Sequence, residues 1–476
     1  MVSTTSTLIV LLAALSLADP SSPQTAAAVA RASHPHFPLS GSSADHQRRQ
    51  DGTDAAGNST SNRAGGKVLR YALQQTEVNA TAPGRRRWQH KSRRRKAKLG
   101  GEEEEEEEEE RLDRRDKWNW KHLEDYRGYL YFMEVEVGDP PQAVKLMPDS
   151  GSFETWVNPN CEKAASPYLC AVNGVYRPEN SELAVTRNEP FDFTYGTGRV
   201  NGMYYEDRIY FRNEDVGIRQ KFGMATDSSF AVSGIIGLGY GMGYTIGYSN
   251  ILDSLVKYDL INAPIYSVSL GGQGEGTSEM VFGGVNRARY SGFLKAIPIW
   301  PPIAQQPPNY VNYRVNVSSF GYTAPSGAKT SFWSPGSSAP MNVLVDTGVT
   351  YSYLPPAMVD SIAETFGSWF ESGEYKVDCA LRDQPGTFNF GFNNDQLVIR
   401  VSYYDFFLKL QDNTCSLGVQ QGADDAILGN TFLRGTYIVY DQSTHSLWMQ
   451  NYRDCGSEVT EVGKSFGDVG QTKGMC

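Results

Sequence analysis

Residues 146–156 read Leu-Met-Pro-Asp-Ser-Gly-Ser-Phe-Glu-Thr-Trp, an apolar approach that ends in an aspartate on a turn of hydroxyl residues and glycine. Residues 343–350 repeat this order as Val-Leu-Val-Asp-Thr-Gly-Val-Thr. The two aspartates, Asp149 and Asp346, lie 197 residues apart (346 minus 149). In both copies a short apolar run precedes the aspartate, which is typical of a buried strand that leads into a turn.

A second repeated segment follows each aspartate. Residues 235–237, Ile-Ile-Gly, end 88 residues after Asp149 (237 minus 149), and residues 427–429, Ile-Leu-Gly, end 83 residues after Asp346 (429 minus 346). Two motifs in the same order and at similar spacing indicate an internal duplication. The length of 476 residues also exceeds what one hydrophobic core normally supports. We therefore expect two similar lobes that each present one aspartate.

Two carboxylates that share a proton have a specific chemistry. They cannot both ionise, so one stays charged while the other stays neutral over a broad acidic range. A water between them can then be deprotonated by one carboxylate while the other polarises a carbonyl, which is general acid–base catalysis of amide hydrolysis. The glycine beside each aspartate allows a tight backbone turn, and the hydroxyl can hold the carboxylate in place.

Further segments resemble a known family, the pepsin-like aspartic endopeptidases, and in particular its secreted fungal members. The resemblance extends from about residue 126 to about residue 451. Besides the two aspartate motifs, it rests on Phe-Thr-Tyr-Gly-Thr-Gly at 193–198, which is similar to the family's flap, on Gly-Gly-Val-Asn at 283–286 and on Ile-Leu-Gly-Asn-Thr-Phe-Leu-Arg at 427–434. The resemblance implies an all-β, bilobal pepsin-like fold, with two duplicated β-lobes and a cleft between them.

The resemblance also implies a role for individual residues. The implied catalytic dyad is Asp149 and Asp346; the implied supporting residues are Ser150, Gly151, Ser152, Thr347 and Gly348; and the implied substrate-binding residues are Met147, Trp156, Tyr195, Gly196, Thr197 and Thr350. Trp156 is the expected hydrogen-bonding partner of Tyr195, and Ser150 and Thr347 are expected to cross-link the floor of the site.

Val349 departs from the family pattern. It stands where the first lobe has Ser152, and its side chain cannot donate a hydrogen bond. Because a donor stabilises the charged carboxylate, its loss raises the pKa of the second aspartate. We therefore expect an acidic activity profile that is shifted upward from that of the most acid-loving members. Pro148, directly before Asp149, is also unusual, since it removes a backbone donor.

The N-terminal 115 residues differ from the rest. Residues 8–18 form an eleven-residue apolar run that is typical of a signal peptide with cleavage after Ala18, although no Lys or Arg precedes it; an anchored or frayed apolar end is the alternative. Residues 19–115 are predicted to be disordered, with basic clusters at 85–87 and 93–98 and nine glutamates at 102–110.

Charge suggests a use for this leader. Residues 1–115 hold 18 Lys and Arg against 15 Asp and Glu, a net +3, while 116–476 hold 26 against 39, a net −13. We expect an inhibitory propeptide that lies on the acidic body and is released at low pH; a solvated charged linker is the alternative. The preferred processing site follows Arg114-Arg115, with Arg48-Arg49 and Arg86-Arg87 as further candidates.

The expected organisation is a signal peptide at 1–18, a propeptide at 19–115, an N-terminal lobe at 116–295, a C-terminal lobe at 296–454 and a disulfide-closed tail at 455–476. All six cysteines lie after the leader, which indicates an oxidising compartment. Six cysteines allow fifteen pairings; by resemblance we expect Cys161 with Cys170 and Cys379 with Cys415, which leaves Cys455 with Cys476. Asn316 opens a glycosylation sequon within the mature part.

The sequence contains few residues that could form a different kind of catalytic, metal or nucleic-acid site. Only two of the six histidines, His122 and His445, follow the leader, so a serine triad or a multi-histidine zinc site is not expected. No Cys-x-x-Cys spacing is present, and we expect neither a metal nor a cofactor. The basic clusters lack the interleaved aromatic residues of a nucleic-acid site. No stretch reaches the ~20 apolar residues of a membrane helix.

The sequence therefore predicts a secreted aspartic endopeptidase that is made as a zymogen and acts on proteins and peptides as a monomer. An extracellular location is expected, and a vacuolar or cell-surface one stays open. The alternative function is that of a catalytically weak or inactive protein of this fold that binds peptides or proteins.

Overall fold

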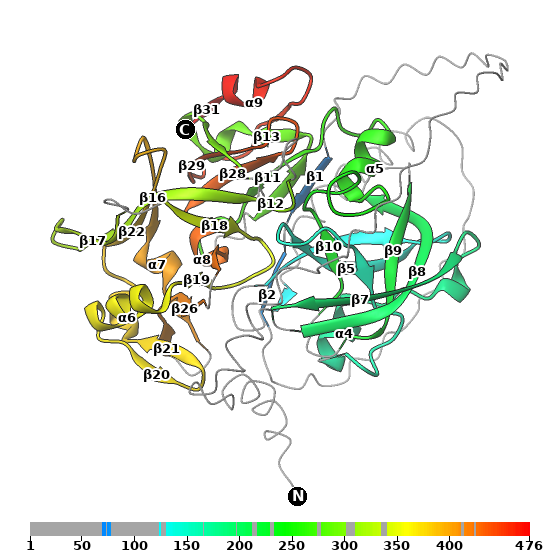
Figure 1. Cartoon of the computed structure of the whole chain (residues 1–476), viewed down its shortest axis with the longest axis horizontal. Coiled ribbons are helices and arrows are strands. Elements are labelled where there is room, and N and C mark those ends of the chain that lie inside the picture. Colours follow the sequence, from blue (N-terminus) through cyan, green and yellow to red (C-terminus); the bar gives the residue numbers. More distant parts are fainter. Residues whose placement is uncertain are drawn as a thin grey trace, which may run out of the picture.

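The computed structural model describes residues 130–476 apart from 165, 197, 212–216, 229–232, 274–277, 301–309, 335–339, 411–413 and 423–424, together with strands at 69–72, 74–77 and 123–124. The predicted signal peptide, the processing sites and His122 lie outside the described residues. Figure 1 shows the strands of the first lobe on the right, those of the second lobe on the left and a group of strands above and between them.

The first lobe is built on the hairpin of β4 (Tyr131–Val137) and β5 (Gln142–Asp149). Apolar residues alternate along β4 and bury one face, as the strand period of two requires. From β5 the sheet continues through β10 (Ile235–Gly237), β6 (Trp156–Val157) and β9 (Ile218–Asp227), with parallel, antiparallel and parallel pairing in turn. Asp149 therefore ends β5, beside Gly237 of β10.

The second lobe repeats this arrangement. β18 (Met341–Val345), β27 (Ala426–Leu428), β19 (Ser352–Leu354) and β26 (Val419–Gln421) are neighbours in that order, again with parallel, antiparallel and parallel pairing. Asp346 directly follows β18, and its N–H donates to the carbonyl of Leu428 at 3.0 Å. The predicted duplication is thus confirmed in strand order and direction, and both aspartates emerge at equivalent places.

A long hairpin extends the sheet of the first lobe. β7 (Val185–Tyr195) and β8 (Gly198–Phe211) pair antiparallel up to Tyr195 and Gly198, and β8 also pairs with β9 and with β4. The hairpin tip carries the segment predicted to be the flap. Because β8 runs from the tip into the body, side chains along it can connect the flap to the rest of the lobe.

Six of the described strands join the lobes in one sheet, in the order β1-β12-β11-β28-β29-β15. β11 (Ile265–Ser269) and β12 (Glu279–Phe282) precede the predicted lobe boundary at residue 295, and β28 (Thr436–Asp441) and β29 (Ser446–Asn451) follow it. β15 (Lys295–Pro298) pairs with β29. The predicted lobe boundary near residue 295 therefore lies inside this shared sheet.

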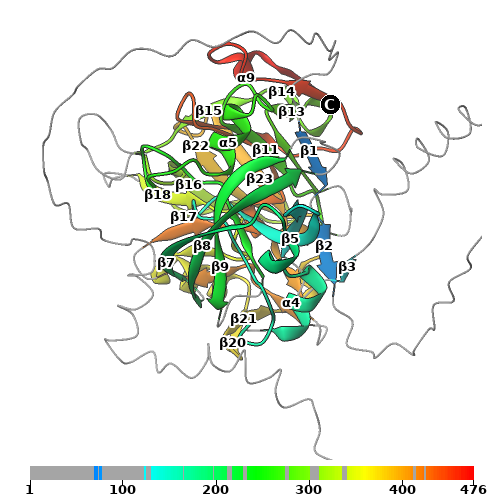
Figure 2. The ribbon, with the colours of Figure 1, turned by 90° about the vertical axis from the view of Figure 1, so that its right-hand side faces the viewer.

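The predicted disorder of residues 19–115 is wrong for two short segments. β1 (Leu69–Ala72) pairs antiparallel with β12 at the edge of the shared sheet. β2 (Gln74–Glu77) pairs antiparallel with β4 and parallel with β3 (Leu123–Glu124). Figure 2 shows the three strands along one side of the body. Backbone pairing with existing strand edges supplies the order that local sequence composition did not indicate.

Helical patterns are few in the sequence, and they predict one helix at residues 251–257 and another at residues 356–370. α5 (Ile251–Lys257) has the predicted bounds, and a capping box between Asn250 and Asp253 starts it. The second helix was predicted for residues 356–370, but α6 (Pro356–Thr365) is shorter. Gly367 adopts φ +61° directly after it, a conformation that ends helices, and the chain then enters β20 (Trp369–Glu371).

The remaining elements complete the lobes. In the second lobe, β22 (Thr387–Phe392) and β23 (Leu397–Ser402) form a hairpin, with positive φ at Asn393, Asn394 and Asp395. The others are α4 (Pro167–Asn173), α7 (Tyr403–Phe406), α8 (Asn430–Leu433), β16 (Arg314–Thr323), β17 (Lys329–Trp333), β21 (Glu374–Val377), β24 (Leu408–Lys409) and β25 (Cys415–Ser416).

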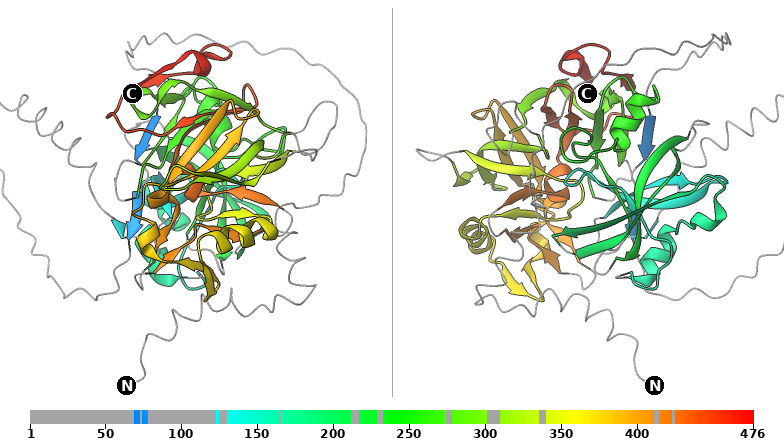
Figure 3. Two further views of the ribbon diagram at one scale, coloured as in Figure 1. Left: turned by 90° about the vertical axis from the view of Figure 1, so that its left-hand side faces the viewer. Right: turned by 45° about the vertical axis from the view of Figure 1, so that its right-hand side comes forward.

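The C-terminal tail packs on the shared sheet. β30 (Val459–Glu461) pairs with β13 (Gly284–Asn286), and β31 (Lys473–Met475) pairs with β14 (Ser291–Phe293), with α9 (Asp468–Gln471) between them. Val462 and Val469 are buried against Tyr290 and Val439. In both views of Figure 3 the tail, in red, lies at one end of the molecule.

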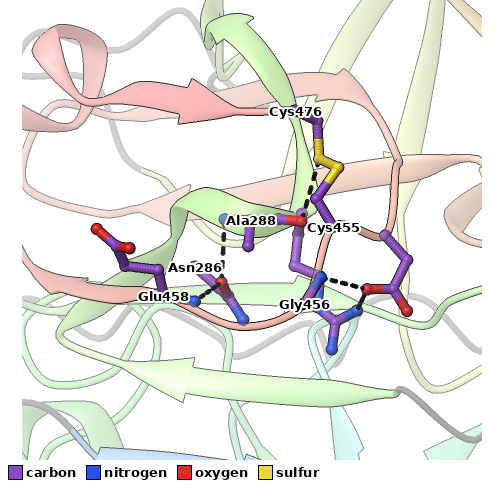
Figure 4. Close-up of a disulfide and its surroundings, with 8 residues drawn as sticks. Asn286, Ala288, Cys455, Gly456, Glu458 and Cys476 are labelled. Atoms are coloured by element: carbon purple, nitrogen blue, oxygen red, sulfur yellow. Dashed lines mark hydrogen bonds and ion pairs between the residues drawn. A yellow bond between two sulfur atoms is a disulfide. The ribbon is translucent and has the colours of Figure 1, made fainter.

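The three predicted disulfides are present. Cys161 bonds Cys170, Cys379 bonds Cys415 and Cys455 bonds Cys476. Figure 4 shows the last of these, where the Cys476 sulfur also approaches the carbonyl oxygen of Ala288 at 3.2 Å. Within the described part of the chain, no helix has the length and hydropathy to cross a membrane, and no group of three or more acidic, Cys or His side chains could hold a metal ion.

Candidate active site

The duplicated turns bring Asp149 and Asp346 together at the junction of the lobes. Both are buried, with 5% and 6% of their surface exposed, and they lie close enough for the charge of Asp149 to raise the pKa of Asp346. Each glycine of the motif lies against the aspartate of the other lobe. A Cβ on Gly348 would lie 2.6 Å from Oδ1 of Asp149, and a Cβ on Gly151 would lie 2.7 Å from Cγ of Asp346. Only glycine leaves room for both carboxyl groups here.

Ser150 and Thr347 form the predicted cross-link beneath the aspartates. The Ser150 N–H donates to the Thr347 hydroxyl at 3.0 Å, and the Thr347 N–H donates to the Ser150 hydroxyl at 2.9 Å. Each hydroxyl in turn donates to a backbone carbonyl of the other lobe, at Val345 and Pro148. Four buried hydrogen bonds therefore fix the two turns, and with them the two carboxylates, relative to each other.

The two carboxylates differ in their donors. Asp149 accepts from the Ser152 hydroxyl at 2.5 Å and from the Gly151 N–H at 2.8 Å. Asp346 accepts from the Gly348 N–H at 2.7 Å, and at the position equivalent to Ser152 it meets Val349, which offers no side-chain donor. The duplication is therefore not symmetric in its chemistry.

This difference in donors separates the pKa values of Asp149 and Asp346. Desolvation raises the pKa of Asp149, while the Ser152 hydroxyl and neighbouring N–H groups oppose the rise. Desolvation raises the pKa of Asp346 well above its ordinary value, and the charge of Asp149 raises it further. The arrangement favours an ionised Asp149 beside a protonated Asp346 at acidic pH.

Tyr195, the predicted flap tyrosine, lies near enough to this pair for the charge of Asp149 to affect its pKa. The Trp156 indole N–H donates to the Tyr195 hydroxyl at 3.1 Å, as predicted. Burial raises the pKa of Tyr195 and the Asp149 charge raises it further, so the phenol keeps its proton near the carboxylates. Gly196 is exposed at the tip with open space around its Cα. Thr197 lies outside the described residues.

Met147 and Thr350, which were both predicted to bind substrate, lie in different surroundings. Met147 packs at the edge of the apolar cluster that contains Trp156, so its side chain supports the flap region. Thr350 is half-buried four residues after Asp346 (350 minus 346), and its carbonyl accepts from the Thr431 N–H at 3.1 Å. Its backbone is thereby fixed to α8.

The glycosylation candidate Asn316 lies in β16 rather than in a loop. It is half-buried, faces Asn342 of β18 and accepts a hydrogen bond from that side chain at 3.2 Å. Modification of Asn316 stays a prediction.

Sequence reasoning missed the residues behind the site. Tyr440 is fully buried, and the charges of Asp346 and Asp149 raise its pKa in addition to desolvation, which indicates that it lies close beneath them. Its ring stacks on Tyr266 at 4.7 Å and contacts Tyr313 edge-on. Glu154 was also missed, although it lies between Asp149 and Trp156 in the sequence. The sequence shows an acidic residue five positions after Asp149, but its burial appears only in the folded structure.

Comparison with known proteins gives one consistent family. The model of the eukaryotic aspartyl protease family matches residues 130–450. The probable aspartic-type endopeptidase opsB of Aspergillus oryzae is 30% identical over 375 residues, 74% of each chain. Candidapepsin-3 of Candida albicans is 29% identical over 65% of this chain and 76% of its own, and rat gastricsin 27% identical over 68% and 81%. The paired aspartates, the duplicated sheets and these matches agree that the chain belongs to the eukaryotic aspartyl protease family, the pepsin-like aspartic endopeptidases.

Proposed function

We propose that Asp149 and Asp346 are the catalytic dyad of an endopeptidase that hydrolyses peptide bonds at acidic pH. The observation that carries the proposal is the contact of two buried carboxyl groups across the lobes, one richer in donors than the other. Asp149, ionised, takes a proton from a water held between the carboxyl groups. Asp346, protonated, donates a hydrogen bond to the substrate carbonyl and polarises it for attack.

The supporting residues each have a part in this reaction. Ser150 and Thr347 keep the carboxyl groups in register through their cross-link, and Gly151 and Gly348 leave the space that both carboxyl groups occupy. Tyr195 closes over the substrate with its hydroxyl held by Trp156. Binding a peptide beneath the flap orients its scissile bond and excludes water from the carboxyl groups, which strengthens their electrostatic effect.

The decisive experiment is proteolysis of an unfolded protein substrate by the processed chain between pH 2 and 7. Cleavage that a pepstatin-type inhibitor blocks and that the substitution Asp346→Asn abolishes is the expected result. An absence of cleavage at every pH, after the leader has been removed, would contradict the proposal and favour the alternative, a protein of this fold that binds peptides without cleaving them.

We also propose that the enzyme is secreted and made as a zymogen. The three disulfides and the name of a Candida albicans relative, secreted aspartic protease 3, support an extracellular location. The pairing of β1 and β2 with the body supports a docked leader, because these strands anchor a segment of net positive charge to an acidic body. After cleavage behind Arg115, the leader would stay bound at neutral pH and leave as carboxylates become protonated.

Activation can be tested by the fate of the N-terminal fragment. After cleavage, size-exclusion chromatography with mass spectrometry should find residues 69–77 with the body at pH 7 and without it at pH 4. A separately expressed peptide of residues 60–115 should inhibit the mature enzyme near neutral pH. If the body is free of the fragment at pH 7, or if the peptide does not inhibit, the propeptide hypothesis is contradicted. The alternative, a solvated charged linker, would then be favoured.

A further inference from the structure

A buried carboxylate that the proposed mechanism does not use lies beside the flap. Glu154 belongs to the loop between β5 and β6, five residues after Asp149 (154 minus 149) and two before Trp156 (156 minus 154), and only 4% of its surface is exposed. Taking a carboxylate out of water is costly unless hydrogen bonds compensate for it. The hydrogen-bonding partners of Glu154 therefore indicate which part of the lobe its burial stabilises.

Two tyrosine hydroxyls from different segments satisfy Glu154. The Tyr204 hydroxyl, on β8, donates to Oε1 at 2.8 Å. The Tyr248 hydroxyl, from the segment between β10 and α5, donates to Oε2. The two rings meet edge to face with centroids 5.8 Å apart. Glu154 thus ties together the loop after Asp149, the long strand of the flap hairpin and a third segment of the lobe.

A cation completes the group. The Nζ of Lys221, on β9, lies 4.3 Å from the ring centroid of Tyr204 and 4.9 Å from that of Tyr248, and it forms an ion pair with Glu189 of β7. Lys221 lowers the pKa of Glu154, whereas desolvation, the largest influence, raises it. The rings are therefore held by the carboxylate through their hydroxyls and by the ammonium group over their faces.

The same tyrosines form part of the packing behind the flap. Tyr204 belongs to the buried cluster of Trp156 and Phe191, and Tyr248 and Tyr195 pack at its edge. The Phe191 and Tyr204 rings lie 5.4 Å apart. A shift of Tyr204 or Tyr248 would therefore move the side chains that set the position of the Trp156 indole, which holds the Tyr195 hydroxyl.

We infer that Glu154 is a positioning residue for the reaction: through Tyr204 and Tyr248 it fixes Trp156, and through Trp156 it fixes the flap hydroxyl of Tyr195 over the carboxyl pair. This inference rests on the proposed function. It predicts that removing a hydrogen bond to Glu154 lowers the turnover number, because Tyr195 is then misplaced. A small misplacement of a residue that acts in the transition state lowers kcat more than it weakens substrate binding.

The structure offers a matched control in the same lobe. Tyr176 donates to the buried carboxylate of Asp207, also on β8, at 2.6 Å, and its ring packs against Phe222, outside the flap cluster. Tyr248→Phe and Tyr176→Phe each remove one phenol donor from a buried carboxylate that keeps another donor, at Tyr204 or the Arg208 N–H. The two variants should lose similar melting temperature.

The experiment measures kcat, KM and melting temperature for both variants, alone and in the Tyr195→Phe background. Tyr248→Phe should lower kcat about tenfold with little change in KM, while Tyr176→Phe should leave kcat unchanged. In the Tyr195→Phe background, Tyr248→Phe should cost less than about twofold more, since coupled residues are not additive. Equal kcat for the two single variants, or fully additive losses, would overturn the inference while wild-type cleavage upholds the proposed function. A wild-type chain that does not cleave would overturn both.

Discussion

Replacing Val349 by threonine would give the second lobe a hydroxyl equivalent to that of Ser152 in the first lobe. This substitution should move the upper limb of the pH–activity profile to lower pH. Val349 is the third residue after Asp346, as Ser152 is after Asp149, and its carbonyl is fixed by the Asn430 N–H at 2.9 Å. A threonine at 349 has nearly the same shape, so its hydroxyl can take the place of a Val349 methyl group toward Asp346.

The magnitude follows from the environment of Asp346. A hydrogen bond to a buried charged group contributes about 1.5–3 kcal/mol, and one pKa unit corresponds to about 1.36 kcal/mol. The new donor stabilises the ionised form of Asp346 only, so it lowers the pH at which the protonated acid is lost. We expect the upper limb of kcat/KM to move down by about one to two pH units in Val349→Thr.

The assay is the pH dependence of kcat/KM on one peptide substrate. Val349→Ala, which removes volume without adding a donor, serves as the control and should leave the limb in place. Ser152→Ala removes the existing donor of Asp149 and should raise the lower limb instead. An upper limb in Val349→Thr that stays unchanged or rises would refute the assignment of Asp346 as the acid.

Three further predictions concern the same turns. Gly348→Ala should reduce kcat/KM at least a hundredfold with a small change in melting temperature, because its Cβ would lie 2.6 Å from Asp149 Oδ1; activity close to wild type would contradict this. Asp346→Asn should have a higher melting temperature than wild type at pH 7 and a similar one at pH 4. The raised pKa of Asp346 confers stability that is complete below the unfolded pKa and is lost as pH rises through the folded pKa. Asparagine does not ionise, so the variant avoids this loss. Ser150→Ala removes one bond to Val345 and the acceptor for the Thr347 N–H, so it should lower the melting temperature and kcat together; thermal unfolding and steady-state kinetics on the same sample test it.

The sequence predicted those parts of the site that depend on short motifs. Ser150 and Thr347 follow their aspartates directly, and the structure contains the cross-link that the family resemblance implied between them. The Trp156–Tyr195 hydrogen bond and the three disulfides followed from resemblance. These features need only that the fold be right.

The features that sequence reasoning missed depend on contacts between distant segments. Tyr248 is 94 residues from Glu154, and neither position carries a recognisable motif, so their hydrogen bond becomes visible only when the lobe is assembled. Strand β1 is four residues long and pairs with β12, more than 200 residues later, so its order comes from an edge that local composition does not reveal. The overlong helix prediction after Pro356 failed for a local reason, the backbone conformation of Gly367.

The departures from symmetry explain how a duplicated scaffold can separate an acid from a base. Two identical turns would give both carboxyl groups the same donors, and their mutual repulsion would then keep one of them protonated without favouring either. Here the first turn retains the Ser152 hydroxyl and the second replaces it with Val349, so the charge has a preferred location on Asp149. The backbone cross-link through Ser150 and Thr347 remains symmetric, because it must keep the carboxyl groups in register whichever one is charged. Geometry is thus fixed by what the two lobes share, and the direction of proton transfer by where they differ.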